Sequence, residues 1–129
     1  EHLNAASCTL ELGKARPFGS NDLQQFAAID LALRAAVSEG PLPVRAADEI
    51  RVFRVMHSLI KHSEDFKLHL GDDTANFTEL KPGMLLCEQP QEDYRVGQEG
   101  AWILFPNPNV ALGLRAGMLL NEVPRSTLY

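Results

Sequence analysis

The residues best suited to chemistry lie together near the start of the sequence, in residues 7–19. Glu11 stands just before a glycine, and Lys14 and Arg16 follow within five residues. Apolar and polar side chains alternate over residues 7–12, a pattern that predicts a short strand with Glu11 on its polar face. The sequence therefore places one carboxylate at the end of a strand, beside two cations.

This arrangement suits a catalytic carboxylate. In open α/β sheets, ligands bind in the crevice beyond the carboxyl ends of the strands, which is where Glu11 would lie. Two nearby cations would keep a carboxylate ionised or bind an anionic substrate beside it. We therefore take Glu11 as a candidate catalytic residue, with Lys14 and Arg16 as candidate substrate-binding residues. The alternative is a surface glutamate paired with a loop lysine.

Several separated blocks of the sequence resemble one known family. Residues 9–23, T-L-E-L-G-K-A-R-P-F-G-S-N-D-L, resemble the catalytic-glutamate segment of the aspartoacylase/succinylglutamate desuccinylase family of zinc hydrolases. The resemblance continues through the carboxyl-terminal half of the desuccinylase members, over residues 62–63, 73–77, 82–83 and 105–117. Agreement in several separated blocks, from about residue 7 to residue 123, is more specific than one motif.

The resemblance implies a zinc amidohydrolase that cleaves N-succinyl-L-glutamate into succinate and L-glutamate in arginine catabolism. Such an enzyme has a carboxypeptidase-like α/β domain, which holds one zinc ion through a His-x-x-Glu motif and a later histidine, and then a smaller β-rich domain. Residues 1–41 would be the end of the catalytic domain and residues 42–129 the β-rich domain. Glu11 would act as general base and acid, and the zinc ligands would lie outside this chain.

The resemblance also has consequences for the chain by itself. The chain is expected to pack on a missing amino-terminal catalytic domain and to be inactive alone, and its start at Glu1 without a methionine agrees with a fragment. Aspartoacylases carry a substrate-binding tyrosine where this sequence has Ala111 and Leu112, which puts aspartoacylase specificity in doubt. The alternative function is a non-catalytic β-rich binding or packing module. The residues upstream of Glu1 would discriminate between the two.

Composition limits the partners. The 129 residues carry a net charge of -5 with 12 scattered basic residues, which argues against a nucleic-acid partner. The sequence has no apolar run long enough to cross a membrane. The two cysteines, Cys8 and Cys87, are too few for a disulfide framework, and buried reduced thiols fit a cytoplasmic protein.

The expected fold class is α+β. After the strand at residues 7–12, a helix capped by Ser20 or Asn21 runs to Gly40-Pro41, with Asp30 and Arg34 as an i, i+4 pair on its surface. The strand and the helix form a strand-loop-helix remnant of an α/β domain. Short apolar runs with frequent turns then predict a compact barrel-like or sandwich-like β domain. Its expected strands include a long one from residue 49 to 60 with a bulge near Phe53 and a second one at residues 66–70. A Pro-Gly turn at residues 82–83 is expected to precede a buried strand, and later strands are expected at residues 94–96 and 102–105. Residues 109–121 are expected to form a C-terminal helix.

The histidines raise a second possibility, a metal site. His57, His62 and His69 lie near several carboxylates, but none stands in a recognised zinc-binding frame. We therefore expect histidines on the surface of strands, although His62 falls in a block that resembles the family. Arg115 is interpreted either as an exposed helix charge or as a late contact to a substrate carboxylate.

Overall fold

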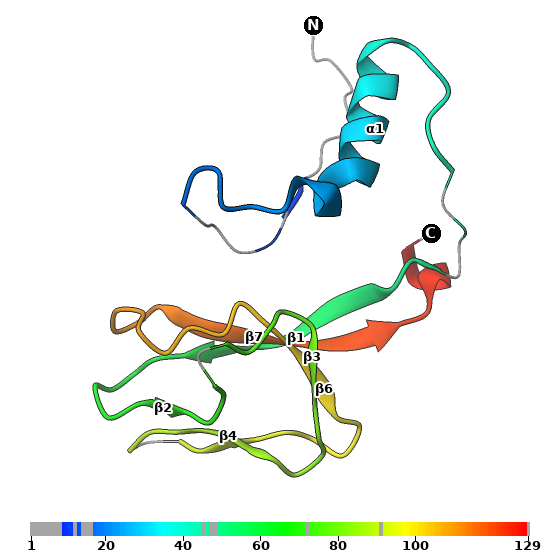
Figure 1. Cartoon of the computed structure of the whole chain (residues 1–129). Helices are drawn as coiled ribbons and strands as arrows, with labels where there is room; N and C mark the ends of the chain where they lie inside the picture. Colours follow the sequence, from blue (N-terminus) through cyan, green and yellow to red (C-terminus); the bar gives the residue numbers. More distant parts are fainter. Residues whose placement is uncertain are drawn as a thin grey trace, which may run out of the picture. The chain divides into compact units, whose positions relative to one another are not determined.

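A computed structural model describes residues 9–11, 13, 17–44, 46, 49–71, 73–90 and 92–128 (Figure 1). The chain divides into two compact units, Glu1–Ala46 and Ala47–Tyr129, called here the helical unit and the β unit. Each is described by itself. The assignment of residues 1–41 to a hydrolase catalytic domain stays a prediction.

The helical unit contains the expected helix. A 3-10 turn, η1 (Leu23–Phe26), leads into α1 (Ala27–Val37). Asp22, rather than Ser20 or Asn21, caps the turn, because its carboxylate accepts a hydrogen bond from the Gln24 amide at 3.1 Å. The expected i, i+4 pair is confirmed, with Arg34 Nε 2.8 Å from the Asp30 carboxylate.

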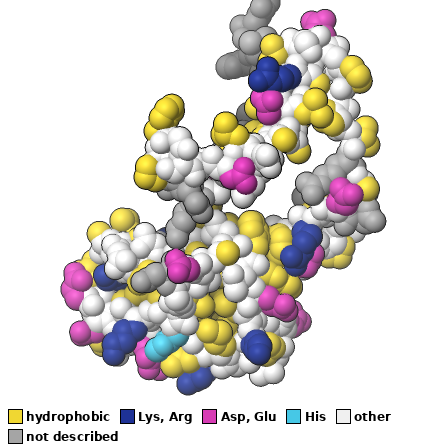
Figure 2. All heavy atoms as spheres, viewed as in Figure 1, with side chains coloured by type: hydrophobic (Ala, Val, Ile, Leu, Met, Phe, Trp, Pro, Cys, Tyr) yellow, Lys and Arg dark blue, Asp and Glu magenta, His cyan; other side chains and the backbone are white. Residues whose placement is uncertain are grey.

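The predicted strand of the helical unit is not seen in its described residues. Thr9–Glu11 have no strand conformation, and the rest of residues 7–12 lies outside the described part. A strand needs hydrogen-bonded neighbours, which this unit does not supply in its described residues. None of those residues is buried either, and Figure 2 shows apolar side chains at the surface of the helical unit.

No helix in the described part of the chain has both the length and the hydropathy that crossing a membrane requires.

The β unit consists of two antiparallel sheets, as the prediction of a β-rich domain requires. The first sheet has the strand order β1-β7-β6-β3 and the second the order β2-β4-β5. The bounds are β1 (Val52–Ile60), β2 (Lys67–Leu68), β3 (Thr78–Leu80), β4 (Leu85–Glu88), β5 (Tyr94–Arg95), β6 (Ala101–Leu104) and β7 (Arg115–Val123), followed by a 3-10 turn, η3 (Arg125–Leu128).

Both sheets contribute to the core. The first sheet supplies Leu59, Ile103 and Leu119, and the second supplies Leu86 and Cys87, all at most 4% exposed. The full cluster comprises Leu59, Phe66, Leu80, Leu86, Cys87, Val96, Ala101, Ile103, Ala116 and Leu119. Burial of this apolar surface is the main favourable term in the folding of the β unit.

The predicted C-terminal helix is wrong. Residues 115–123 form β7, which pairs with β1 on one side and β6 on the other. A central strand that is buried on both faces reads as a continuous apolar run, and such a run cannot be told from a buried helix by periodicity alone. Gly117 has a packing role, because an added Cβ would lie 3.1 Å from Ile103 Cδ1.

The long first strand is confirmed with a different irregularity. Its register with β7 shifts between Val55 and His57 and again between Leu59 and Ile60, not at Phe53.

The expected Pro-Gly turn is present, since Gly83 has a φ of 75° and the Met84 amide donates to the Lys81 carbonyl. The three-residue strand β3 has no counterpart in the prediction.

Candidate functional site

The predicted catalytic segment is only partly described. Glu11 is exposed and makes no hydrogen bond or ion pair with any other described residue. Lys14 and Arg16 lie outside the described residues. Whether these three side chains come together therefore stays a prediction, and it depends on the rest of the protein to which the segment belongs.

In the β unit, two of the blocks that carry the family resemblance are joined directly, and Lys61, next to a third block, contacts one of them. The Asn76 side-chain oxygen accepts a hydrogen bond from the Phe105 amide at 2.8 Å, which joins residues 73–77 to residues 105–117. The Lys61 amide donates to the Leu114 carbonyl at 3.0 Å, and the Gly113 amide donates to the Lys61 carbonyl at 2.8 Å. We call residues 61–65 and 105–114 the loop cluster.

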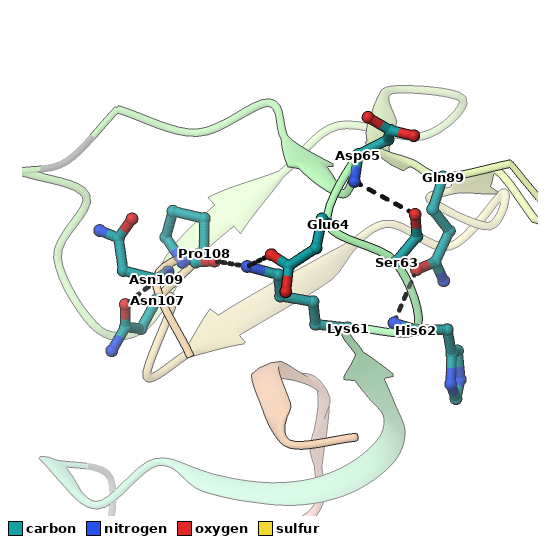
Figure 3. A network of polar contacts seen from close by, with 9 residues as sticks. All are labelled: Lys61, His62, Ser63, Glu64, Asp65, Gln89, Asn107, Pro108 and Asn109. Carbon is teal, nitrogen blue, oxygen red and sulfur yellow. Dashed lines mark hydrogen bonds and ion pairs between the residues drawn. The ribbon is translucent and has the colours of Figure 1, made fainter. Parts of the chain in front are cut away.

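Lys61 is the centre of the loop cluster. Its side chain is only 13% exposed, and its Nζ lies 3.5 Å from the Pro108 carbonyl oxygen and 3.7 Å from a Glu64 carboxylate oxygen (Figure 3). The loop itself is braced by Asn107, whose side-chain oxygen accepts from the Asn109 amide at 3.0 Å. Lys61, whose side chain is largely buried, therefore links the 105–114 loop to the end of β1.

Gln89 connects the loop cluster to the second sheet. Its side-chain oxygen accepts from the His62 amide at 2.9 Å, and its Nε2 donates to the Ile60 carbonyl at 3.3 Å. The imidazole of His62 is exposed and points away from the other residues drawn in Figure 3. His62 thus enters this network through its backbone.

A pocket of about 200 Å³ lies beside this connection. Its lining residues are His57, Ser58, Leu59, Ile60, His62, Cys87, Gln89, Glu92 and Tyr94. The His57 and Tyr94 rings stack with centroids 4.6 Å apart. Burial raises the pKa of both the Cys87 thiol and the Tyr94 phenol, so each is neutral at neutral pH.

The pocket does not have the composition of a hydrolytic site. A thiol with a raised pKa is a poor nucleophile. The described residues contain no group of three or more His, Cys, Asp or Glu side chains that fits a metal ion. His57, His62 and His69 therefore do not fit a zinc ion, and we assign no step of a reaction to a metal held by the described residues.

The structure places two other predicted positions on strands of the β unit or directly beside them. His69, directly after β2, has its Nε2 2.6 Å from a carboxylate oxygen of Glu88 in β4. Arg115 is exposed at the start of β7, opposite Ile60, and is not on a helix. Sequence reasoning missed Lys61 and Gln89. Little in the sequence points to either role, since Lys61 only follows the long strand β1 and Gln89 only follows the apolar run of β4.

The β unit matches a family model. Residues 48–123 match the AstE/AspA barrel-sandwich hybrid domain. Over 129 residues, the chain is 74% identical to a succinylglutamate desuccinylase of Serratia proteamaculans and covers 39% of that protein. It is 54% identical over 128 residues to a succinylglutamate desuccinylase of Yersinia pestis, again covering 39%. The chain thus spans about two fifths of the length of these curated relatives.

Solved structures agree with these matches. The structure of a succinylglutamate desuccinylase from Vibrio parahaemolyticus aligns with a TM-score of 0.76 at 29% identity, over 88% of this chain and 33% of that one. The enzyme from Chromobacterium violaceum aligns with a TM-score of 0.63 at 41% identity, with the same coverages. The chain belongs to the AstE/AspA family, as the motif resemblance predicted, and corresponds to a carboxyl-terminal part of its desuccinylase members.

Proposed function

We propose that the full-length protein hydrolyses N-succinyl-L-glutamate to succinate and L-glutamate, late in arginine catabolism. The observation that carries this proposal is the 74% identity, over all 129 residues, with a succinylglutamate desuccinylase. The proposal places the enzyme in the cytoplasm, and the buried free thiol of Cys87 suits a reducing compartment.

Glu11 is the proposed general base and acid. Its carboxylate takes a proton from the attacking water as the new C–O bond forms at the amide carbon. It then gives that proton to the nitrogen of the glutamate leaving group as the C–N bond breaks. The exposure of Glu11 in this chain supports a role that is completed by other parts of the protein.

Lys14 and Arg16 are the proposed anion-binding residues of the same loop. The substrate carries three carboxylates, and a planar guanidinium can make a two-pronged contact to one of them that an ammonium cannot. Arg16→Ala is therefore expected to raise KM more than Arg16→Lys does.

Zinc is proposed for the full-length enzyme, with its ligands in the part that precedes this chain. A metal at such a site would supply Lewis-acid chemistry toward the amide carbonyl. The residues of this chain that belong to the proposal are Glu11, Lys14 and Arg16. The β unit is proposed to pack on that preceding catalytic part.

The test is the Glu11→Gln variant of the full-length enzyme, assayed for release of glutamate from N-succinyl-L-glutamate. The amide keeps the shape of the side chain but cannot transfer the proton, so kcat is expected to fall by about 10² to 10⁴. Asp22→Asn, a change at the nearby helix cap, is the matched control and is expected to keep near-normal kcat. The 129-residue chain alone is expected to show no hydrolysis.

Two results would contradict this proposal. Near-normal turnover by Glu11→Gln would make Glu11 a structural residue. Absence of hydrolysis by the intact wild-type protein, purified with its metal, would favour the alternative of a non-catalytic β module.

A further inference from the structure

The four-stranded sheet of the β unit has two apolar faces. Leu59, Ile103 and Leu119 point into the core from one face. Because side chains alternate along a strand, their neighbours lie on the opposite face, which we call the outer face. It carries Phe53, Val55, Trp102, Leu104, Met118 and Leu120. An antiparallel sheet with one face in water normally carries polar residues there, so this pattern is typical of a covered sheet.

Aromatic rings dominate one end of the outer face. The Phe53 ring lies 5.0 Å from that of Phe77 and 5.5 Å from that of Trp102, measured between centroids. The guanidinium of Arg51 lies 4.9 Å and 5.4 Å from the Phe53 and Trp102 centroids. Arg51 also donates two hydrogen bonds to Glu122, at 3.0 Å and 2.7 Å.

The Arg51–Glu122 ion pair bears on the charge of the partner that the outer face could bind. The charge of Arg51 is met within the β unit by Glu122, so the patch does not require an acidic partner. What remains is a cluster of aromatic and aliphatic groups with a polar rim. Such a composition fits the centre of a protein–protein contact.

Exposure across the outer face is graded. At its centre, Met118 and Leu120 are 8% and 2% exposed, whereas Val55 and Phe77 are 51% and 46% exposed. The centre of the outer face is therefore buried, and Val55 and Phe77, whose ring packs on Phe53, are the exposed apolar side chains beside it. Grouped exposed apolar side chains of this kind mark interaction sites.

We propose that the outer face is the docking surface for the part of the full-length protein that precedes this chain. The inference rests on the proposed architecture of the full-length enzyme. More than half of the length of the curated relatives lies outside the region that this chain matches, which supplies a covalently linked occupant. A tethered domain reaches the face at a high effective concentration, which favours it over a second copy of the chain.

The test uses Val55→Cys in the full-length protein, with His69→Cys as the matched control. The His69 side chain, directly after β2, is 39% exposed, and Val55 is 51% exposed. If nothing covered the outer face, the Val55→Cys thiol would therefore react at least as fast as the His69→Cys thiol. Alkylation is followed at each cysteine by mass spectrometry under native conditions and in urea. Docking is expected to make the native alkylation rate of Val55→Cys about tenfold or more slower than that of His69→Cys. In urea, where the docked state is lost, the two rates are expected to become similar.

A photo-cross-linker attached at Val55→Cys then identifies the occupant. The expected cross-links join this position to residues that precede the chain. Equal native alkylation rates at the two positions would overturn the proposal. So would cross-links to residues 9–44, or cross-links between differently isotope-labelled copies. None of these readouts depends on hydrolysis, so failure here is distinct from failure of the proposed activity.

Discussion

The two units differ in how far each can stabilise itself. The described residues of the β unit include twelve hydrophobic side chains that are at most 8% exposed, and those of the helical unit include no buried side chain. Yet the helical unit carries Glu11, the proposed catalytic carboxylate. The β unit thus holds its own core, whereas the proposed catalytic carboxylate belongs to a unit whose described residues have none.

The helix itself shows why the helical unit needs neighbours. Leu31, Leu33 and Val37 are 58%, 52% and 87% exposed along α1. Eleven residues are fewer than an isolated helix needs to be stable in water, and helices in proteins gain most of their stability by packing an apolar face. The helix thus follows local sequence rules, but these three apolar side chains are not buried by the described residues of the chain.

The largest expected effect comes from removing one core side chain in the β unit. Ile103 is fully buried, so Ile103→Ala is expected to reduce the free energy of unfolding of the 129-residue chain by about 2–5 kcal/mol. Leu33→Ala, the matched change in the helical unit, is expected to stay within about 0.5 kcal/mol. Urea unfolding followed by the fluorescence of Trp102, the single tryptophan, measures both. Equal losses would mean that the helical unit has a core of its own.

The sequence predicted the features that depend on local chemistry. The helix with its Asp30–Arg34 pair, the long first strand and the Pro-Gly turn each follow from spacing within a few residues. The family also followed, because separated blocks matched at once. What remains unconfirmed is the role of Glu11, Lys14 and Arg16, since the partners of that loop lie beyond its own sequence.

The errors have a common physical cause. Residues 115–123 form a central strand because β1 and β6 pair with it on both sides, and no local pattern shows that pairing. β3 is three residues long, too short for an alternation to stand out. Residues 9–11 have strand-like alternation without a strand to pair with among the described residues. In each case the presence or absence of long-range strand pairing, rather than local preference, determined the structure.

An intermediate effect is expected at Gly100. Its φ is 72°, and an added Cβ would lie 3.1 Å from the Leu80 carbonyl oxygen, so Gly100→Ala combines left-handed strain with a backbone contact. Its expected cost is about 1–3 kcal/mol in the free energy of unfolding. Gly19 has a φ of 82° with nothing within 4 Å, and Gly19→Ala is expected to leave the unfolding midpoint of the β unit unchanged. The same urea titration compares them, and a smaller loss for Gly100→Ala than for Gly19→Ala would contradict the comparison.

The smallest expected effect separates two exposed ion pairs, one in each unit. Arg51 lowers the pKa of Glu122 in the β unit, and Arg34 lowers the pKa of Asp30 in the helical unit. A carboxylate whose pKa is lower in the folded state stabilises that state above its unfolded pKa, about 4 for either residue, and this contribution disappears as pH falls through the folded pKa. For Arg51→Gln, we therefore expect a loss of stability relative to wild type that is larger at about pH 6 than at about pH 3.

Arg51 also lies over Phe53 and Trp102, and loss of these ring contacts does not depend on the charge of Glu122. The stability that Arg51→Gln loses is therefore compared at the two pH values. The part of the loss that is present only at the higher pH comes from the ion pair, and the part that persists at low pH comes from the ring contacts. Arg34→Gln is expected to leave the urea midpoint unaltered at both pH values, because its pair spans one turn of a helix without a core. A difference for Arg51→Gln that is equal at both pH values would show that the rings alone hold this arginine.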